Sequence, residues 1–452
     1  MTPFQISEEL INEFKVDIES HNINSLKKRT SEYHYADLAE IVDELTTEEG
    51  LYLIKLLDSE KTSDVLTELD DDTRDNILEL LSVKEIVGEI DELDTDDAVD
   101  IISELPTERQ EQIFAQMGDE KRIQNIKELL NYDENSAGGL MAKELVKVNE
   151  NWTVTKCVKE MRQQASEVTR VHSIYVINDN EELIGRLSLK DLLTADNKSK
   201  IKSVYIPKVD YVFVTDKADE VAKLMTKYDL EAVPVVDSNK ILLGRITIDD
   251  IVDFIKDEAE KDYQLAAGVT SDVEADDNIF ELTKARLPWL FLGLLGGLGS
   301  VFILEGFEKI MMDPSYRILF FFTPLIAAMA GNVGVQSSAI IVQGLANKSL
   351  KGSLLNRLLK EIGLSIINGI ALGIVIVIFG LITSLNLSMS LTIALSMLCV
   401  IVVSALVGTF VPIVLDKNNI DPAIATGPFI TTCNDIFGIF LFFYIAKLVL
   451  GF

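Results

Sequence analysis

Cysteine and histidine are scarce in this sequence. Its 452 residues include three of each, namely Cys157, Cys399, Cys433, His21, His34 and His172. The cysteines stand far apart, without the CxxC or Cys/His spacing of a zinc site, which predicts a reducing compartment. A site for a soft metal, built from thiolate or imidazole ligands, is therefore excluded as the basis of function.

Signatures of catalysis are missing as well. The sequence contains no GxxxxGK[S/T] phosphate loop, no HExxH zinc motif and no Ser/His/Asp set, so we do not expect an enzyme. Its first residues, MTPFQISEEL, lack the basic and apolar regions of a cleavable signal. We therefore expect the N-terminal half to stay in the cytosol.

Positive charge is scarce in the first part of the chain, and charge of either sign is scarce in the second. Residues 1–286 hold 65 acidic and 33 basic side chains, whereas residues 287–452 hold 7 and 8. An acidic surface attracts cations and repels nucleic acid, so no nucleic-acid partner is expected. Five apolar segments in the second part are long enough to cross a lipid bilayer: 287–304, 318–346, 362–384, 389–415 and 422–446.

Basic residues near these segments predict their orientation. The connection 347–361 carries Lys348, Lys351, Arg357 and Lys360, whereas the connection 305–317 carries only two basic residues. Because basic connections remain in the cytosol, we expect a multi-pass protein of the cell membrane with cytosolic N-terminal domains. The same rule places the C-terminus outside.

A twelve-residue repeat runs through the acidic half. Leucine recurs at this strict spacing at Leu45, Leu57, Leu69, Leu81, Leu93 and Leu105. Most of these leucines are followed by a residue that starts helices, as in LTTEE and LSVKE. The pattern predicts a stack of short helices with acids outside, which is an α-helical solenoid.

A second repeat follows at a spacing of 59 residues. IYVINDNEELIGRLSLKDLL, residues 174–193, aligns with VPVVDSNKILLGRITIDDIV, residues 233–252. Each predicts a strand, a turn, a second strand and a helix start, and resembles a CBS domain; two in tandem resemble the usual pair. In that family the G-h-h-[S/T]-x-x-D ending often receives a nucleotide ribose, which implicates Thr247 and Asp250. The alternative is a helix N-cap.

One carboxylate interrupts the last apolar segment: Asp435, within GPFITTCNDIFGIFLFFYIA. An acid at the bilayer centre costs ~2.5–3.5 kcal/mol, so a function is expected, although a headgroup position or a hydrogen bond from Thr431, Thr432 or Asn434 is the alternative. Oxygen ligands of this kind suit a hard cation such as Mg²⁺, which gives up its water reluctantly. A symmetric dimer would bring two copies of Asp435 together.

Glycine and proline predict breaks in two segments. Pro324, Gly331 and Gly334 weaken helix continuity around Asn332 and Gln336, and the stretch DPAIATGPFITTCND repeats the theme in the fifth segment. Broken helices are tolerated where backbone carbonyls face protein or water, as along an ion path. By contrast, the glycines of GLLGGLG at 293 and 297 predict only close helix packing.

Together these features resemble the MgtE family of magnesium channels, through AGNVGVQ in the second segment and DPAIATGPFITTCND in the fifth. The resemblance covers nearly the whole chain. It implies a multidomain fold: an acidic α-helical N-domain at 1–131, an α/β tandem CBS pair at 132–256, a connecting plug helix at 257–282, and an all-α domain of five transmembrane helices at 283–452.

The same resemblance implies a homodimer in the lipid bilayer that takes up Mg²⁺ and closes when cytosolic Mg²⁺ is high. Mg²⁺ is then both substrate and regulatory ligand, and ATP at the CBS pair is left open. The implied pore residues are Asp435, Asn332, Thr432 and Asn434. The implied regulatory residues are Asp421, Glu258, Asp262, Asp216, Asp219, Asp229, Asp250, Asp96 and Asp97. Lys261 stands where the family pattern has a further acid, which leaves one of the implied regulatory sites between subunits open.

Two other functions remain open. An ion-coupled transporter of Mg²⁺, Co²⁺, Ni²⁺ or Mn²⁺ could use the same pore residues, but the sequence offers no second acid within the apolar segments to hold a coupling ion. A membrane-anchored CBS sensor that conducts nothing would need neither Asp435 nor broken segments. A magnesium channel is therefore the prediction.

Overall fold

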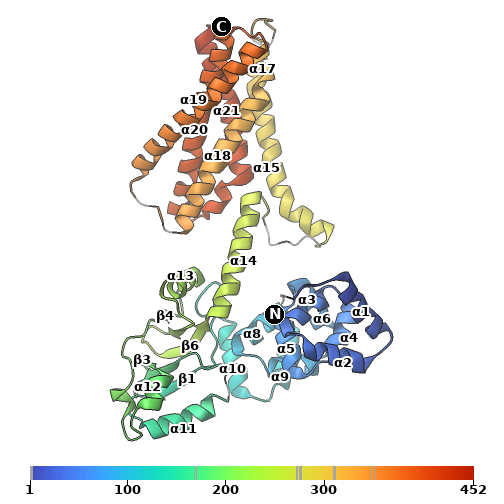
Figure 1. Ribbon diagram of the computed structural model, residues 1–452, viewed down its shortest axis with the longest axis vertical. Coiled ribbons are helices and arrows are strands. Elements are labelled where there is room, and N and C mark those ends of the chain that lie inside the picture. Colours follow the sequence, from blue (N-terminus) through green and yellow to red (C-terminus); the bar gives the residue numbers. More distant parts are fainter. Residues whose placement is uncertain are drawn as a thin grey trace. The chain divides into compact units, whose positions relative to one another are not determined.

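The computed structural model describes residues 4–166, 168, 170–270, 273, 277–308, 312–347, 349–350 and 352–451. Lys348 and Lys351, which helped to orient the apolar segments, lie outside these residues. The chain divides into two compact units, Met1–Ile255 and Lys256–Phe452 (Figure 1). The finer division into four domains stays a prediction.

Short helices build the first part of the first unit: α1 Glu8–Glu19, α2 Ile23–Glu32, α3 Tyr35–Asp43, α4 Thr47–Ile54, α5 Ser59–Glu68, α6 Asp71–Leu80, α7 Val83–Ile90, α8 Thr95–Glu104, α9 Thr107–Gln116 and α10 Glu120–Leu129. Alternate helices pack together, α3 on α5, α5 on α7 and α7 on α9, with α4 on α6 and α8 on α10 beside them. The predicted helical solenoid is confirmed.

The leucine repeat marks the starts of helices α4 to α9. Leu45, Leu81 and Leu105 are buried just before α4, α7 and α9 begin. Thr46 and Ser82 then cap α4 and α7 in capping boxes, in which each hydroxyl accepts a backbone N–H and a glutamate three residues on accepts in return. The buried leucine fixes each turn against the core, and the polar cap after it starts the next helix.

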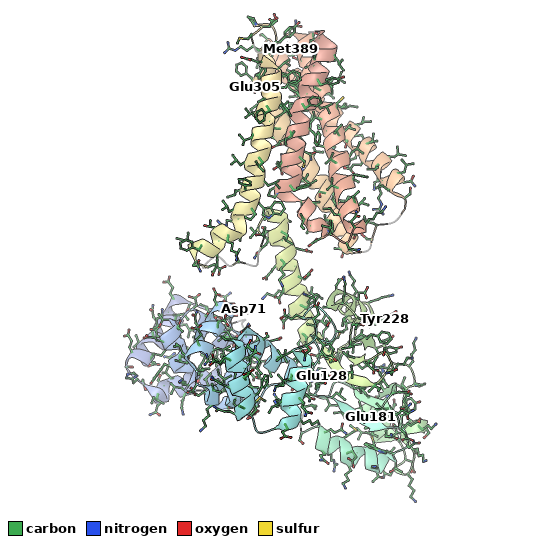
Figure 2. The ribbon with its side chains drawn as sticks, turned by 180° about the vertical axis from the view of Figure 1, so that it is seen from behind. Asp71, Glu128, Glu181, Tyr228, Glu305 and Met389 are labelled. Atoms are coloured by element: carbon green, nitrogen blue, oxygen red, sulfur yellow. The ribbon has the colours of Figure 1, made fainter. Side chains whose placement is uncertain are left out.

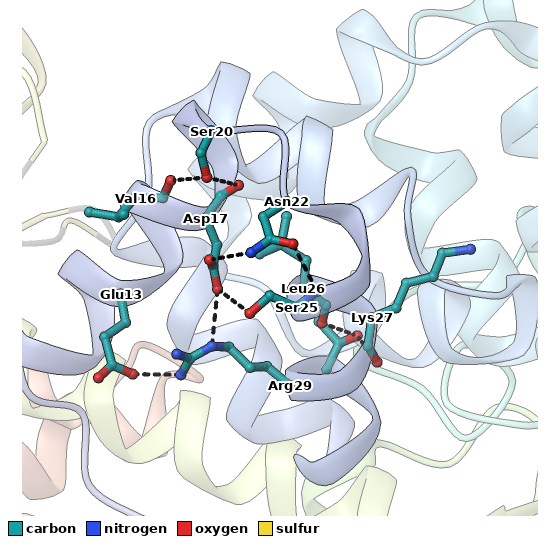
Figure 3. A network of polar contacts seen from close by, with 10 residues as sticks. Glu13, Val16, Asp17, Ser20, Asn22, Ser25, Leu26, Lys27 and Arg29 are labelled. Carbon is teal, nitrogen blue, oxygen red and sulfur yellow. Dashed lines mark hydrogen bonds and ion pairs between the residues drawn. The ribbon is translucent and has the colours of Figure 1, made fainter.

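A polar network ties the first two helices together. The Arg29 guanidinium of α2 donates to Asp17 on α1 at 3.1 Å and also pairs with Glu13 (Figure 3). The same Asp17 carboxylate accepts from the Ser25 hydroxyl at 2.6 Å and from the Asn22 amide at 3.3 Å. These carboxylates are therefore engaged in holding the α1–α2 hairpin.

The rest of the first unit contains two small sheets. The elements are β1 Val146–Asn149, α11 Val154–Gln164, β2 Ile174–Ile177, β3 Leu183–Leu187, α12 Leu189–Thr194, η1 Ile201–Ser203, β4 Val212–Phe213, α13 Ala218–Tyr228, β5 Ala232–Val236 and β6 Leu242–Thr247. Helix α14, Ile248–Ala267, begins in the first unit and continues past Ile255 into the second. In each sheet the first two strands pair in parallel and the last two are antiparallel. The repeat predicted from sequence is thus a structural repeat.

The paired glycines of this repeat are explained by close backbone approach. A Cβ on Gly185 would lie 2.3 Å from the carbonyl oxygen of Ile206, and one on Gly244 would lie 2.5 Å from that of Ala142. Each glycine also pairs with a β-strand residue next to a bulge, at Val176 and Val235. Only a residue without a side chain admits the neighbouring backbone here.

The second unit is helical: α15 Ile279–Gly306, α17 Ile318–Phe321, α18 Thr323–Ala346, α19 Leu354–Ile382, α20 Leu387–Lys417, η2 Pro422–Ala425 and α21 Gly427–Leu450. In the described part of the chain, five helices are long and apolar enough to cross a membrane, with α21 counted together with η2. Figure 1 shows α18, α19, α20 and α21 side by side, and α20 contacts the other three. Figure 2 shows Glu305 of α15 and Met389 of α20 at the same end of this bundle.

Two expectations about these helices are wrong. The second apolar segment is not broken around Asn332 and Gln336, because α18 is continuous from Thr323 to Ala346. The interruption lies earlier, between α17 and α18, and Pro324 is in the first turn of α18, where proline is tolerated. In α15, a Cβ on Gly293 or Gly297 would meet no described atom within 4 Å. Gly296 and Gly299 of α15 pack on α21 instead.

The glycine geometry gives a test of stability. We expect Gly244→Ala to destabilise the first unit by about 1–3 kcal/mol, because the added methyl meets a backbone carbonyl that cannot move aside. Gly88→Ala, inside α7 with open space around the added methyl, should instead stabilise it by about 0.5–1 kcal/mol. Denaturant unfolding of the full-length protein in detergent measures both; equal midpoints for the two variants would contradict the packing argument.

Candidate functional site

Asp435 lies one helical turn beyond Thr431 on α21. Around the helix axis it lies roughly 40° from Thr431 and roughly 60° from Thr432 on the other side. A Cβ on Gly296 of α15 would lie 1.9 Å from the Thr432 methyl carbon, and a Cβ on Gly331 of α18 would lie 2.9 Å from the Thr431 methyl carbon. Asp435 is therefore placed between the side of α21 that meets α15 and the side that meets α18.

The absence of a side chain at Gly331 leaves room for this acid. A Cβ there would lie 3.5 Å from Oδ1 of Asp435. The carboxylate is partly buried, and within the described residues no hydrogen bond or ion pair is made to it. The Thr431 hydroxyl donates to the carbonyl of Gly427 at 2.7 Å rather than to Asp435. The structural hydrogen bond considered from sequence is thus not formed.

The other predicted pore residues do not gather around Asp435. Asn434 is 0% exposed and faces Gly334 of α18, and neither its amide oxygen nor its amide nitrogen has a partner in the described residues. Asn332, beside Gly331, is exposed on α18. Thr432 turns its methyl group to α15. Of these four residues, Asn434 is buried, Thr432 and Asp435 are partly exposed, and Asn332 is exposed.

A carboxylate of α19, just outside the apolar segment predicted at 362–384, bonds to the interior of the helix bundle. Glu361 of α19 accepts a hydrogen bond at 2.6 Å from Ser337, a buried residue in the middle of α18. The next residue, Ser338, donates at 2.6 Å to the carbonyl of Ala425 in η2. Glu361 lies only about two helical turns from the start of its helix, so the apolar segment taken from sequence began just after it.

In the first unit, the fold brings acids of α8 and α14 together. The guanidinium of Arg245, buried at the end of β6, donates to Asp94 at 3.0 Å and to the backbone carbonyl of Glu144 at 2.5 Å. The Glu144 carboxylate in turn accepts from the backbone N–H and hydroxyl of Thr95, at 3.0 and 2.7 Å. This network fixes the first turn of α8 beside the first turn of α14.

Three predicted regulatory acids meet at this junction: Asp96, Asp97 and Asp250. Burial and the nearby Asp250 and Asp97 carboxylates raise the pKa of Asp96 well above its ordinary range. Burial and Asp250 raise the pKa of Asp97 to about 7, and burial raises that of Asp250 to about 6 although bonds from Thr247 oppose the shift. The cluster therefore carries negative charge at neutral pH only at an electrostatic cost.

Thr247 and Asp250 serve the start of α14. The Asp250 carboxylate accepts from the backbone N–H of Thr247 at 2.8 Å and from its hydroxyl at 2.6 Å. Thr247 is buried. This geometry matches the alternative predicted from sequence, a helix cap. A nucleotide could bind Thr247 or Asp250 only by replacing the hydrogen bonds between them.

Several other predicted regulatory acids have local partners. Asp216 accepts from the backbone N–H of Phe213, and Asp421 accepts from that of Ala423 at the start of η2, both at 2.8 Å. Asp219 pairs with Lys223 one turn away at 2.6 Å. Asp229 follows the last residue of α13 and has φ of 50°. Two further predicted acids lie along α14: Glu258, which is exposed, and Asp262, which is partly buried.

No ready-made metal cage is present among the residues that the structure describes, since no three acid, histidine or cysteine side chains are close enough to hold an ion. The Asp96, Asp97 and Asp250 cluster fits a hydrated divalent cation better than a fully dehydrated one. Sequence reasoning missed Arg245, Asp94 and Glu144, the residues that hold the cluster together. These residues are far apart in sequence, and no sequence pattern indicates that the end of β6 lies beside the start of α8.

The raised acid pKa values predict how stability depends on pH. The pKa of Asp97 in the folded protein lies above the ordinary value of 3.8. Its contribution to the free energy of unfolding is therefore fully present below pH 3.8 and is lost as the pH rises through about 7. Without divalent cations, the first unit should unfold at lower denaturant at about pH 8 than at about pH 5, and Mg²⁺ should restore it. Asp97→Asn should reduce this dependence, whereas Asp219→Asn, in an exposed ion pair, should leave it; the opposite ranking would contradict the cluster.

Comparison with known proteins agrees with this architecture. Residues 323–445 match the family described as divalent cation transporter, residues 33–135 the MgtE intracellular N domain, and residues 137–198 and 201–257 the CBS domain. The magnesium transporter MgtE of Enterococcus faecalis is 36% identical over 72% of this chain and 71% of its own length, and that of Bacillus subtilis is 33% identical over 71% of each.

A solved structure is similar as well. It is the cytosolic domain of the Mg²⁺ channel MgtE in complex with ATP, which is 30% identical and covers 54% of this chain and 99% of its own, with a TM-score of 0.51. The family matches, the relatives and the five apolar helices agree with one another. The chain is a multi-pass membrane protein that belongs to the MgtE family of magnesium transporters.

Proposed function

We propose that this chain conducts Mg²⁺ through a pore lined by Asp435 and closes it when Mg²⁺ binds the acids of its cytosolic unit. The observation that carries the proposal is the setting of Asp435: a partly buried carboxylate, within a candidate membrane span, that no described side chain neutralises. Such a charge is stable in a membrane only beside water or a cation.

The ion at Asp435 keeps most of its water. One carboxylate in each copy cannot complete an octahedral shell, and Mg²⁺ dehydrates reluctantly. In a homodimer, two copies of Asp435 face one hydrated ion, and the exposed amide of Asn332 contacts its water shell. Thr432 acts through its packing on α15 rather than as a ligand, and Asn434 acts from inside the bundle.

The cytosolic cluster supplies the sensor. Asp96, Asp97 and Asp250 repel one another, and a divalent cation between them removes that repulsion, so binding favours the compact arrangement. Asp250 is in the first turn of α14, which continues unbroken to Ala267 and carries Glu258 and Asp262. An ion shared by these two acids and Asp421 then holds the pore closed, while Asp216, Asp219 and Asp229 add weaker sites.

Three finer points follow from the same proposal. The N-domain ends near residue 131, the CBS pair near 256 and the plug helix near 282. The C-terminus lies outside the cell. ATP binding at the CBS pair is part of this proposal: the solved cytosolic domain of the related channel is in complex with ATP, and here Thr247 and Asp250 would exchange their mutual hydrogen bonds for contacts to the nucleotide.

An ion-coupled transporter is the second candidate, and Glu361 is the observation that favours it. A carboxylate bonded to a buried serine inside the helix bundle could bind and release a proton or Na⁺. A coupled transporter would stop when the coupling gradient is removed, whereas a channel continues to pass Mg²⁺ down its own gradient. Flux into liposomes with and without a pH or Na⁺ gradient distinguishes the two.

Asp435→Ala should abolish Mg²⁺ influx, because the pore would lose its only carboxylate at the ion. We expect the protein to remain folded, since the replaced side chain makes no ion pair with a described residue. Mg²⁺ entry into liposomes that contain purified protein measures the effect. The matched control is Glu305→Gln, which removes an acid in the last turn of α15 and should conduct normally. If Asp435→Ala passes as much Mg²⁺ as the parent protein, the pore assignment is refuted.

Removal of residues 1–256 should leave a pore that conducts but no longer closes at high Mg²⁺. The sensor acids Asp96, Asp97 and Asp250 are lost, while Asp435 and the helix bundle remain. Patch recordings across a range of Mg²⁺ on the cytosolic side test this. If the acids serve only solubility, the truncated protein will express less well but will close at the same Mg²⁺ concentration as the parent.

A further inference from the structure

The end of α14 makes close backbone contact with the start of α21. Gly427, the first residue of α21, has φ of 46°, and a Cβ on it would lie 2.1 Å from the carbonyl oxygen of Ala266 in the last turn of α14. Gly268, which follows α14, has φ of 84°, and a Cβ on it would lie 2.4 Å from Cγ of Pro428. Glycine is thus required on both sides of one contact, by backbone conformation and by space.

This contact is held from both sides. After α14 the chain is tied back by hydrogen bonds from Val269 N–H to the Gln264 carbonyl at 2.9 Å and from Thr270 N–H to the Ala285 carbonyl of α15 at 3.1 Å. On the other side, Ser338 of α18 donates to the carbonyl of Ala425 just before α21. These hydrogen bonds hold the end of α14 to α15 and the start of α21 to α18, on the two sides of the contact.

From Gly427 the contacts continue to the pore acid. The Thr431 hydroxyl donates to the Gly427 carbonyl at 2.7 Å, so its side-chain orientation follows the first turn of α21. The Thr431 methyl carbon and Oδ1 of Asp435 would lie 2.9 and 3.5 Å from a Cβ on Gly331, so both face the same place on α18. Thr431 and Asp435 are one helical turn apart on one side of α21.

We infer that Gly427 and Thr431 are positioning residues that transmit the position of α14 to Asp435. The path is a series of direct contacts: the Ala266 carbonyl against Gly427, the Gly427 carbonyl bonded to Thr431, and Thr431 beside Asp435 at Gly331. The inference rests on the proposed function, because it needs a pore that closes with Mg²⁺. It adds that closure acts on the ion site through the first turn of α21, in addition to any block at the pore mouth.

The alternative is that the glycines only allow tight packing, as at Gly185 and Gly244. Packing alone would make any substitution reduce the amount of folded protein without changing the Mg²⁺ concentration that closes the pore. A positioning role predicts the reverse: folded, conducting protein whose closure is shifted. The Thr431 hydroxyl separates the two, because its hydrogen bond to Gly427 is a specific link and its methyl group is the packing element.

The test uses full-length protein in liposomes, recorded by patch clamp over a range of Mg²⁺ on the cytosolic side. Gly427→Ala forces the end of α14 away from α21, and we expect the Mg²⁺ concentration for half closure to rise about tenfold, a usual size for coupling between two sites. Conductance of the open pore should stay close to that of the parent. Gly297→Ala, with no described atom near the added methyl, is the matched control and should close as the parent does.

A second pair keeps the inference testable if Gly427→Ala fails to fold. Thr431→Val keeps the shape and removes the hydrogen bond, so closure should again require more Mg²⁺; Thr431→Ser keeps the hydroxyl and should close as the parent does. Equal closure in Thr431→Val and Thr431→Ser, or parental closure in a folded Gly427→Ala, would overturn the inference. If the parent itself does not close with Mg²⁺, the proposed gating fails first and the inference with it.

Discussion

Negative charge that the protein itself does not neutralise governs this molecule. A carboxylate held away from water needs a cationic partner, and in a membrane its cost without one is ~2.5–3.5 kcal/mol or more. Asp435 has no such partner among the described residues, while burial and the neighbouring Asp250 carboxylate raise the pKa values of Asp96 and Asp97. A bound divalent cation would offset the negative charge at both sites. We therefore interpret both as places in the fold where Mg²⁺ binds.

The scaffold around these acids is built to keep them there. Arg245 is a buried cation, and its guanidinium bonds to Asp94 and to the Glu144 carbonyl, which fixes the start of α8 in position. In the membrane unit, small residues do the equivalent work: Gly331 leaves room beside Asp435, and Gly296 lets α15 approach Thr432. Helix α14 joins the two regions, since it begins beside the cluster and ends against Gly427.

Periodic features were predictable from the sequence, and contacts between distant residues were not. The twelve-residue leucine spacing gave the solenoid, and the repeat at 59 residues gave the paired sheets, because each reflects a local unit that recurs. The structural role of the glycines was harder to predict. Gly331 and Gly334 were expected to break α18, but they accept side chains of α21 in a continuous helix. The sequence around a glycine does not show whether that glycine bends its own helix or leaves room for a side chain of a neighbouring helix.

The candidate site shows the same limit. Asp435 could be found from the sequence because a lone acid in an apolar run is unusual, and Asn434 was grouped with it by adjacency. Neighbouring helix positions point about 100° apart, so Asn434 faces the bundle interior while Asp435 does not. The residues that position the acids, Arg245 and Thr431, carry no local signal; their roles depend on where β6, α8, α14 and α21 meet.

In the proposed sensor, Mg²⁺ displaces protons from the acid cluster and removes the repulsion between its carboxylates. Calorimetry in buffers of different ionisation enthalpy measures how many protons are released when Mg²⁺ binds the full-length protein. Because the pKa of Asp97 is raised to about 7 and that of Asp250 to about 6, we expect proton release that is largest near neutral pH and absent when Asp96, Asp97 and Asp250 are all replaced by asparagine. Mg²⁺ binding without proton release, or the same release in that variant, would contradict the proposed sensor.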